Sequence, residues 1–249
     1  MDFRIKLADI ILNITCQYEL LREYCRDYIL TELEEKNEWQ EYICIKPDDL
    51  KVEYRRIMEK EKSVVYTLQY IETLVALRKI ANIIPDYDRF LMHGAVLSWK
   101  ENAYMFTASS GTGKSTHVAL WKRYLGKGVQ IINGDKPIIS VSLEECMVYG
   151  TPWAGKEHWQ KNRKVPLKGI CIIKRGKENI IRQITPSEAL PVLIGQIYFT
   201  EDTEKAGKVM ELLEQLFEQV PIYQLECDIS EEAVKNSFEM MTGEKYYKC

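Results

Sequence analysis

Apolar and polar residues alternate with two different periods in the first third of this 249-residue chain. Near the N-terminus apolar side chains occupy every second position, over 3–7 and again over 10–14, which is typical of short strands with one buried face. Over 17–33 and 64–84 they recur at every third or fourth position, which is typical of helices. Residues 1–85 are therefore predicted to form a small α+β appendage that ends in a connecting helix.

Beyond residue 85 strands and helices are predicted to alternate, which is the pattern of an α/β core. A capping box, Thr185 with Glu188, marks the start of one of these helices. Apolar runs predict strands at 90–99, 103–107, 129–132, 138–141, 146–149, 165–174, 179–183 and 222–227. Helices are predicted at 117–125, 185–198, 204–220 and 230–242. We therefore predict a second domain over 86–249.

One loop in this core carries a chemical signal. The segment 108–116, Ala-Ser-Ser-Gly-Thr-Gly-Lys-Ser-Thr, follows the strand predicted at 103–107 and precedes an amphipathic helix. In this context the N–H groups of a loop and the positive end of a helix dipole face one anion, so the segment is predicted to bind phosphate. Ala108 stands where the usual pattern has its first glycine, so the match is to the relaxed pattern. The alternative is a loop of small residues that only caps the helix.

The positions of the loop have distinct expected roles. Lys114, expected to be an exposed loop lysine, would reach the β- and γ-phosphates of a nucleoside triphosphate, and the Ser115 hydroxyl would bind Mg²⁺. The backbone would cradle the phosphates. The predicted nucleotide-binding residues are Ser110, Gly111, Thr112, Gly113, Lys114, Ser115 and Thr116.

Two residues outside the loop are candidates for the chemistry of this site. Asp135 follows the strand predicted at 129–132, about twenty residues beyond Lys114, where nucleotide enzymes place a second metal ligand. Without a phosphate-binding loop it would be only a turn aspartate after Asn-Gly; with the loop, it is expected to bind Mg²⁺ or accept a proton. His93 is a candidate phosphate contact or proton-transfer partner, although a lone histidine is more often a core residue.

Basic and aromatic residues gather after the strand predicted at 146–149. The loop 150–159 holds two glycines, two tryptophans, Lys156 and Glu157, which is more than a connector needs. We therefore include Lys156 and Glu157 as candidate contacts of the phosphoryl group or its acceptor. Arg163 and Lys164 are candidates for neutralising the transferred phosphoryl group, with a solvated basic turn as the alternative for at least one of them. His117 is expected to be structural.

Composition narrows the classes of function. The 34 basic and 37 acidic residues give a net charge of −3, which leaves no basic footprint for nucleic acid. No stretch approaches the ~18 apolar residues of a membrane span, and no signal peptide is recognisable. Seven dispersed cysteines are typical of reduced thiols. We expect a cytoplasmic protein that binds neither nucleic acid nor membrane; oligomerisation stays open.

Taken together, the motifs resemble the C-terminal catalytic domain of the HPr kinase/phosphorylase family, and more closely the HPr-kinase-like proteins of bacteria. The resemblance covers roughly residues 85–225, and its motifs are His93-Gly94, 107–116, 133–137, 150–153, 155–156 and 166–169. It implies a phosphoenolpyruvate-carboxykinase- or HPr-kinase-like mixed-sheet core with a P-loop. It also implies ATP or another nucleoside triphosphate, Mg²⁺ and transfer to a hydroxyl.

The chain departs from the family in three ways. HPr kinases carry two adjacent aspartates where this chain has Gly134-Asp135, so the roles of base and metal ligand cannot both be copied. The later stretch rich in glycine and arginine, which supports reverse phosphorolysis, is not recognisable. Residues 1–85 match nothing in the bifunctional enzyme.

We therefore predict an ATP- and Mg²⁺-dependent kinase of a hydroxyl, by preference a serine of a peptide or protein, rather than a true HPr kinase. Lys114, Asp135 and His93 are the expected catalytic residues, and Ser115 and Asp135 the expected metal ligands. Two alternatives stay open: a nucleotide-binding regulatory or assembly module that turns over slowly, and a kinase of a small molecule.

Overall fold

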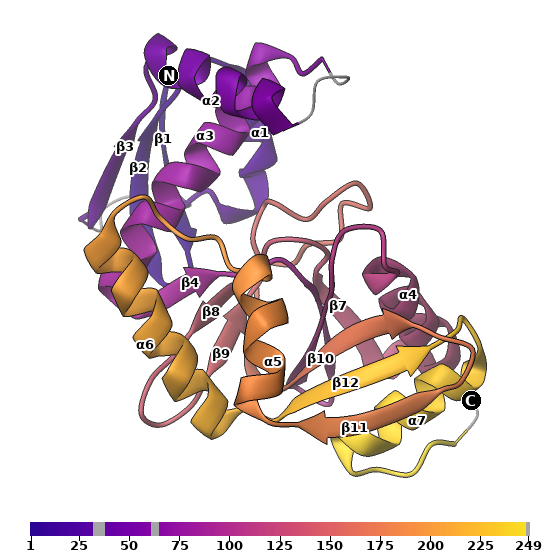
Figure 1. Ribbon diagram of the computed structural model, residues 1–249. Helices are drawn as coiled ribbons and strands as arrows, with labels where there is room; N and C mark the ends of the chain where they lie inside the picture. Colours follow the sequence, from indigo (N-terminus) through magenta and orange to yellow (C-terminus); the bar gives the residue numbers. More distant parts are fainter. Residues whose placement is uncertain (32–37, 61–64, 248–249) are drawn as a thin grey trace.

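The computed structural model describes residues 1–31, 38–60 and 65–247. Its architecture is mixed α/β, with a small N-terminal sheet and a large mixed sheet (Figure 1). Most of the turn at 34–38 and the first residue of the helix predicted over 64–84 lie outside the described residues.

The N-terminal part is built on a hairpin, as the alternating pattern predicts. Strands β1 (Asp2–Leu7) and β2 (Ile10–Thr15) are antiparallel, and β3 (Glu41–Cys44) runs parallel to β2. Apolar side chains from one face of this sheet share a buried cluster with residues of α1 (Glu19–Tyr24) and α3 (Leu68–Ile83). Helix α2 (Pro47–Lys60) packs on α3. The third strand and the burial of this face stabilise the hairpin, because an isolated two-stranded hairpin is marginally stable in water.

The helix predicted over 17–33 is much shorter than its spacing suggests. It ends at Tyr24 and is followed by the 3₁₀ turn η1 (Arg26–Tyr28). The chain then becomes extended, and the Leu30 N–H donates to the Arg4 carbonyl at 3.1 Å. Pairing with the edge of β1 therefore replaces the helical hydrogen bonds that the periodicity predicted.

The large sheet has the strand order β4-β8-β9-β10-β6-β5-β7, with β12 beside β10 and β11 beside β12. Strand β10 runs parallel to β6 and β12, whereas β5 is antiparallel to both β6 and β7. The bounds are β4 (Arg89–Leu91), β5 (Ala95–Trp99), β6 (Asn102–Thr107), β7 (Val129–Asn133), β8 (Ile138–Ser140), β9 (Met147–Tyr149), β10 (Lys164–Arg175), β11 (Ile180–Ile184) and β12 (Ile222–Cys227).

Helices cover both faces of this sheet (Figure 1). Apolar residues of α4 (Lys114–Leu125) and α7 (Glu231–Thr242) form a buried cluster with one face. Those of α5 (Pro186–Leu193) and α6 (Thr203–Gln219) form another with the opposite face. The predicted capping box of α5 is present, with Thr185 and Glu188 bonded reciprocally.

The strand predicted over 90–99 is divided in two. Strand β4 pairs with β8, whereas β5 pairs with β6 and β7, and Met92, His93 and Gly94 lie between the two strands. The reason is long-range bonding, since the His93 N–H donates to the Gln196 carbonyl at 2.7 Å and the Gly94 N–H to the Asp135 carbonyl at 2.9 Å. The helix predicted over 185–198 also ends early, at Leu193, before the 3₁₀ turn η5 (Ile194–Gln196).

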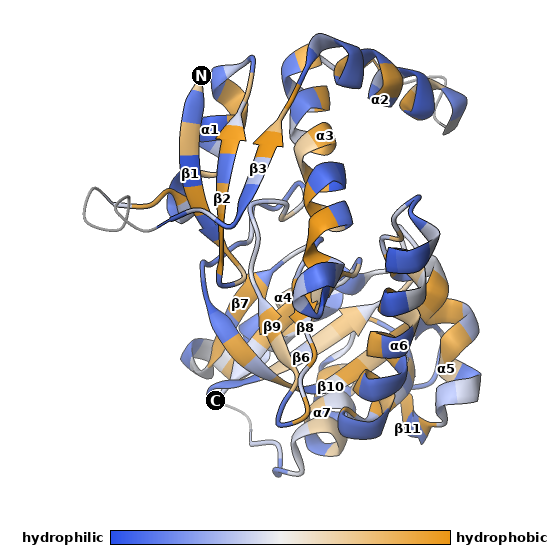
Figure 2. Ribbon diagram, turned by 90° about the vertical axis from the view of Figure 1, so that its left-hand side faces the viewer, coloured by the Kyte–Doolittle hydropathy of each residue, from blue (hydrophilic) through white to orange (hydrophobic). Residues whose placement is uncertain are grey.

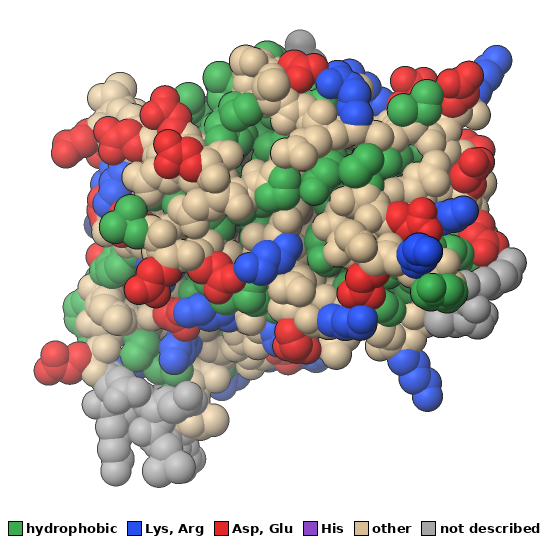
Figure 3. Space-filling view, turned by 90° about the horizontal axis from the view of Figure 1, so that it is seen from below, with side chains coloured by type: hydrophobic (Ala, Val, Ile, Leu, Met, Phe, Trp, Pro, Cys, Tyr) green, Lys and Arg blue, Asp and Glu red, His purple; other side chains and the backbone are tan. Residues whose placement is uncertain are grey.

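Helix α3 connects the two sheets. Figure 2 shows apolar residues along it, and Ile71 and Val75 share a buried cluster with Leu91 and Trp153 of the second part. The domain boundary at 85/86 stays a prediction. Acidic and basic side chains are interspersed on the face seen in Figure 3. Within the described ranges, each helix is too short or too polar to cross a bilayer.

Candidate active site

Four chain segments converge at one edge of the large sheet. Because β5 is antiparallel to β6 and β7, its beginning lies beside their carboxyl ends. Strand β10 is parallel to β6, so Arg175 at its end reaches the same edge. Parallel strands typically place a ligand site beyond their carboxyl ends. The sheet order therefore brings together His93, the loop after β6, Asp135 and Arg175.

The loop 108–113 lies between β6 and α4, as the sequence pattern predicts. Gly111 has a φ of +76° and Gly113 a φ of +123°, both in the region that favours glycine. The Thr112 N–H and hydroxyl both donate to the Ser109 carbonyl, at 3.3 and 2.9 Å. These bonds fix a tight loop directly before the positive end of α4. Phosphate binding by this loop stays a prediction.

Lys114 is buried rather than exposed, contrary to the expectation from sequence. Only 7% of it is exposed, because it is the first residue of α4 and its side chain folds back under the loop. Its Nζ donates to the Ala108 carbonyl at 2.8 Å and to the Ser109 carbonyl at 3.4 Å. Burial lowers the pKa of Lys114, with Asp135 opposing and Lys136 adding to the effect. The loop thus holds a poorly solvated cation.

Asp135 is positioned by the side chain of Asn133, the last residue of β7. The fully buried Asn133 amide oxygen accepts from the N–H groups of Asp135, at 2.9 Å, and Lys136, at 2.8 Å. Its amide nitrogen donates to the Thr151 carbonyl at 3.0 Å. This Asx turn explains why Asn-Gly-Asp follows the strand: the asparagine fixes the direction in which the chain turns.

Two side-chain nitrogens lie close to the carboxylate of Asp135. Lys136 Nζ lies 3.0 Å and His93 Nε2 3.2 Å from Asp135 Oδ1. His93 Nδ1 lies 2.9 Å from Gln196 Oε1. Burial, together with Lys136 and Lys114, lowers the pKa of His93 from 6.5 to about 4, although Asp135 opposes this shift. His93 is therefore neutral at pH 7 and carries one ring proton, which serves either the Nδ1 contact with the Gln196 oxygen or the Nε2 contact with the Asp135 carboxylate, since both oxygens only accept.

These residues line one cavity of about 470 Å³. Its wall includes every predicted loop residue from 110 to 116 except Thr112, together with His93 and Asp135. The candidate contacts Lys156 and Glu157 also line it. Three cationic side chains, those of Lys114, Lys156 and Arg175, are thus set against two carboxylates. A concave site with this charge suits an anion that also carries a metal ion.

Arg163 and Lys164 are not part of this arrangement. Lys164 is the first residue of β10 and Arg163 directly precedes it, roughly 35 Å of strand away from Arg175 at the other end. Arg163 donates to Gln130 Oε1 at 2.8 Å and pairs with Glu101, while Lys164 Nζ lies 2.9 Å from Asp9 Oδ2. Local partners therefore neutralise both cations, and their expected contact with a phosphoryl group does not fit the structure.

The structure adds residues that the sequence analysis missed. Arg175 reaches the loop from the end of β10, and Gln196 reaches His93 from the turn after α5. Arg175 could have been predicted, because it is a basic residue directly after a predicted buried strand. Nothing in the sequence around Gln196 indicates that it contacts the site. Gly134 also gains an explanation: a Cβ there would lie 2.5 Å from the Ala154 carbonyl oxygen. The aspartate that the resemblance to HPr kinases requires at this position has no room.

Comparisons with known proteins give limited information. No protein-family model matches the chain, and no curated protein does. Among solved structures, the chain is similar to the HPr(Ser) kinase/phosphatase from Coxiella burnetii, with 10% sequence identity and a TM-score of 0.36. The match covers 62% of this chain and 99% of that one. This is a distant likeness of fold, and it says nothing of the activity of this chain.

Proposed function

We propose that this protein is an ATP- and Mg²⁺-dependent kinase that transfers the γ-phosphoryl group to a hydroxyl, by preference a serine of a peptide or protein. One observation carries the proposal. Lys114, under a glycine-bearing loop at the start of α4, and Asp135, at the end of β7, line the same cavity. A buried cation and a carboxylate on either side of an anion-binding loop are the parts that phosphoryl transfer requires.

The loop supplies the binding energy for the phosphates. Its backbone N–H groups and the N-terminus of α4 favour a negative charge in the cavity. The Lys114 ammonium, which now donates to two loop carbonyls, exchanges them for phosphate oxygens. That exchange is favourable because phosphate oxygens carry negative charge, so the ammonium gains an attraction between opposite charges that neutral carbonyls do not offer.

The chain's oxygen ligands suit Mg²⁺. Mg²⁺ prefers oxygen and commonly takes one or two protein ligands besides phosphate and water. Ser115, in the first turn of α4, and Asp135 are the residues that would hold it. When bound, the ion neutralises charge on the β- and γ-phosphates. Among the described residues no three His, Cys, Asp or Glu side chains gather as a metal site.

The alternative role of Asp135 is to take the proton, in which case Ser115, phosphate and water would hold Mg²⁺. The acceptor oxygen forms a bond to the γ-phosphorus while the bond from that phosphorus to the β–γ bridging oxygen breaks, and the hydroxyl proton passes to the carboxylate. Among the described residues, the side-chain contacts of Asp135 involve Oδ1, which leaves Oδ2 for this proton. Lys136 and His93 hold the carboxylate in place. Glu157 is a second carboxylate on the wall of the cavity.

The test compares wild type with Asp135→Asn. We expect phosphoryl transfer from γ-labelled ATP to fall by roughly 10²–10⁴-fold, the contribution of a positioned acid–base group, while nucleotide affinity changes much less. Asp9→Asn is the matched control, since Asp9 pairs with Lys164 outside the cavity and should leave turnover unchanged. Serine-containing peptides, cell extract and a small-metabolite fraction serve as acceptors. Equal, slow turnover in wild type and Asp135→Asn would contradict the proposal and favour a regulatory nucleotide-binding module.

A further inference from the structure

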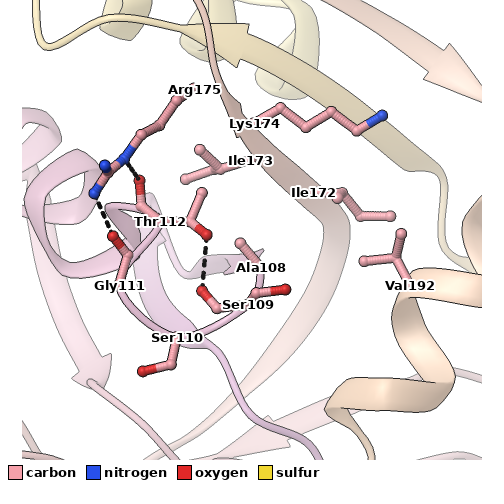
Figure 4. A pocket seen from close by; sticks show the side chains of 10 residues that line it. All are labelled: Ala108, Ser109, Ser110, Gly111, Thr112, Ile172, Ile173, Lys174, Arg175 and Val192. Atoms are coloured by element: carbon pink, nitrogen blue, oxygen red, sulfur yellow. Dashed lines mark hydrogen bonds between the residues drawn. The ribbon is translucent and has the colours of Figure 1, made fainter.

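Arg175 ends β10 beside the loop, and its guanidinium reaches two loop carbonyls. Its Nε donates to the Thr112 carbonyl at 3.1 Å, and its Nη2 donates to the Gly111 carbonyl (Figure 4). The residue is exposed. Both loop carbonyls are thus bonded by one guanidinium. Arg175 is therefore a basic residue that contacts the backbone of the loop directly.

Arg175 does more than bond to the loop, because its side chain also lines two cavities. It lines the 470 Å³ cavity with Lys114 and Asp135, and it also lines a neighbouring cavity of about 480 Å³ on the flank of the loop (Figure 4). In that second cavity it lies with Val192 and the end of β10. Arg175 thus lies between the cavity of the predicted phosphate site and the neighbouring cavity on the flank of the loop.

The present hydrogen bonds of Arg175 are weak ones to exchange. A bond from an exposed side chain to a neutral carbonyl contributes little to stability, because water competes for both partners. Phosphate offers the planar guanidinium two parallel charged bonds, which are both stronger and more directional. A triphosphate in the loop therefore gives Arg175 a better partner within the same cavity.

The site also requires such a cation. Negative charge spreads over three oxygens of the phosphoryl group as it is transferred, and an arginine commonly stabilises that charge. Lys114, beneath the loop, is already assigned to the β- and γ-phosphates, and the side chain of Lys156 is 90% exposed. Arg163 and Lys164 are held at the far end of β10. Arg175 is the remaining basic wall residue with a bidentate head.

We propose that Arg175 is the catalytic arginine of this site: its guanidinium leaves the Gly111 and Thr112 carbonyls and binds oxygens of the transferring phosphoryl group. This inference rests on the proposed function. It assigns to the end of β10 the role that the sequence analysis gave to Arg163 and Lys164.

The experiment compares wild type, Arg175→Lys and Arg175→Ala, with Arg182→Ala as the matched control. Arg182 is an exposed arginine on β11 that pairs with Glu188 at 2.8 Å and lies outside the cavity. We measure the transfer rate, the affinity for ADP, and the affinity for ADP with Mg²⁺ and aluminium fluoride, which resembles the transferring phosphoryl group. A transition-state analogue isolates interactions that form only during transfer.

We expect Arg175→Ala to lower the rate by about 10³-fold, at the lower end of what a catalytic arginine contributes. Binding of ADP with aluminium fluoride should weaken strongly, while ADP affinity and thermal stability stay near wild type. Arg175→Lys, which keeps the charge but not the paired donors, should retain part of the rate. Arg182→Ala should behave as wild type.

Two results would overturn the inference while leaving the proposed function intact. In one, Arg175→Ala transfers phosphoryl groups as fast as wild type. In the other, ADP and the fluoride complex weaken equally and the melting temperature falls, which identifies a structural clamp. A wild type that transfers to no acceptor overturns the proposed function itself, so the two failures are distinguishable.

Discussion

His93 Nε2 lies 3.2 Å from Asp135 Oδ1, although a hairpin, a loop, a helix and the strand β7 separate the two residues in the sequence. The contact joins the segment between β4 and β5 to the end of β7. Burial and the cations around His93 disfavour its protonation, so the neutral tautomer with its proton on Nε2 is the form that would donate to this oxygen. His93 is therefore a positioning residue for Asp135 in our proposal.

This relationship predicts the pH dependence of transfer. Because the pKa of His93 is lowered to about 4, the rate should show no ionisation near pH 6.5 from this residue, and should fall only as the pH approaches 4. His93→Ala should lower the rate roughly 10- to 100-fold, the equivalent of one hydrogen bond to a charged group, and His93→Gln, which keeps a donor, should lower it less. Rate profiles from pH 4 to 9 test this; a wild-type inflection near 6.5 that disappears in His93→Gln would contradict it.

The same shift has a consequence for stability. Between pH 6.5 and about 4 the unfolded chain binds a proton at His93 that the folded chain does not. The free energy of unfolding should therefore fall as the pH is lowered through this window, and the contribution of His93 should be fully present above 6.5. Urea unfolding of wild type and His93→Gln at pH 7 and pH 5 measures the difference between the two proteins, which should be larger at pH 7 than at pH 5.

Lys114→Met should separate function from stability. Burial lowers the pKa of Lys114, so the charged form costs free energy in the folded protein without its ligand. Methionine keeps the apolar stem and removes this cost. We expect transfer to fall by at least about 10²-fold, as when a preorganised donor is removed, while the urea midpoint stays equal or rises. Rate and unfolding are measured on the same preparation. Unchanged transfer would contradict the phosphate-binding role of the loop.

Nucleotide binding should raise the melting temperature. A ligand at a hundred times its dissociation constant adds about 2.7 kcal/mol to stability, and Mg²⁺ should enhance the effect through Ser115 and Asp135. GTP is expected to act like ATP, because no residue of the loop reads the base. Thermal unfolding with ATP, GTP or pyrophosphate, each with and without Mg²⁺, tests this. If none of them shifts the transition at millimolar concentration, the cavity is not a triphosphate site.

Part of this arrangement could be predicted because it is local in sequence. Strand β6, its loop and α4 are contiguous, so apolar periodicity and glycine spacing define them together. The hairpin β1–β2 and the capping box at Thr185 are local in the same way. Asp135 was predicted to lie near the loop because it follows a buried strand. The strand order agrees, since β6, which precedes the loop, and β7, which precedes Asp135, both flank β5 and end on the same side of the sheet.

The remainder depends on pairing between distant segments. The helix predicted from residue 17 ends at Tyr24 because Leu30 bonds to β1, and the strand predicted over 90–99 breaks because His93 and Gly94 bond to Gln196 and Asp135. Arg175 reaches the site only because β10 lies beside β6. Such contacts arise from strand order, which periodicity does not specify. The burial of Lys114 was missed for a related reason: its cover comes from carbonyls of the folded loop.

The contact at Gly134 gives a test of how tightly the site is built. A Cβ there would lie 2.5 Å from the Ala154 carbonyl oxygen, which belongs to the segment that also packs Gly155 against Asp135. A backbone carbonyl cannot move aside as a flexible side chain can. We therefore expect Gly134→Ala to lower the free energy of unfolding by about 1–3 kcal/mol, the usual cost of overpacking.

Transfer should fall with it, because the displaced segment carries Gly155, whose own Cβ position is only 3.2 Å from Asp135 Cβ. Gly207→Ala is the matched control: this glycine lies in α6 with open space around its Cβ position, so alanine should stabilise the helix by roughly 0.5–1 kcal/mol and leave transfer unchanged. Gly134→Asp, which recreates the aspartate pair of HPr kinases, should be at least as destabilised as Gly134→Ala and should not gain activity. Urea unfolding and transfer rates of the three variants decide the matter: a stable, faster Gly134→Asp would show that this segment can yield, and that Asp135 does not depend on the glycine beside it.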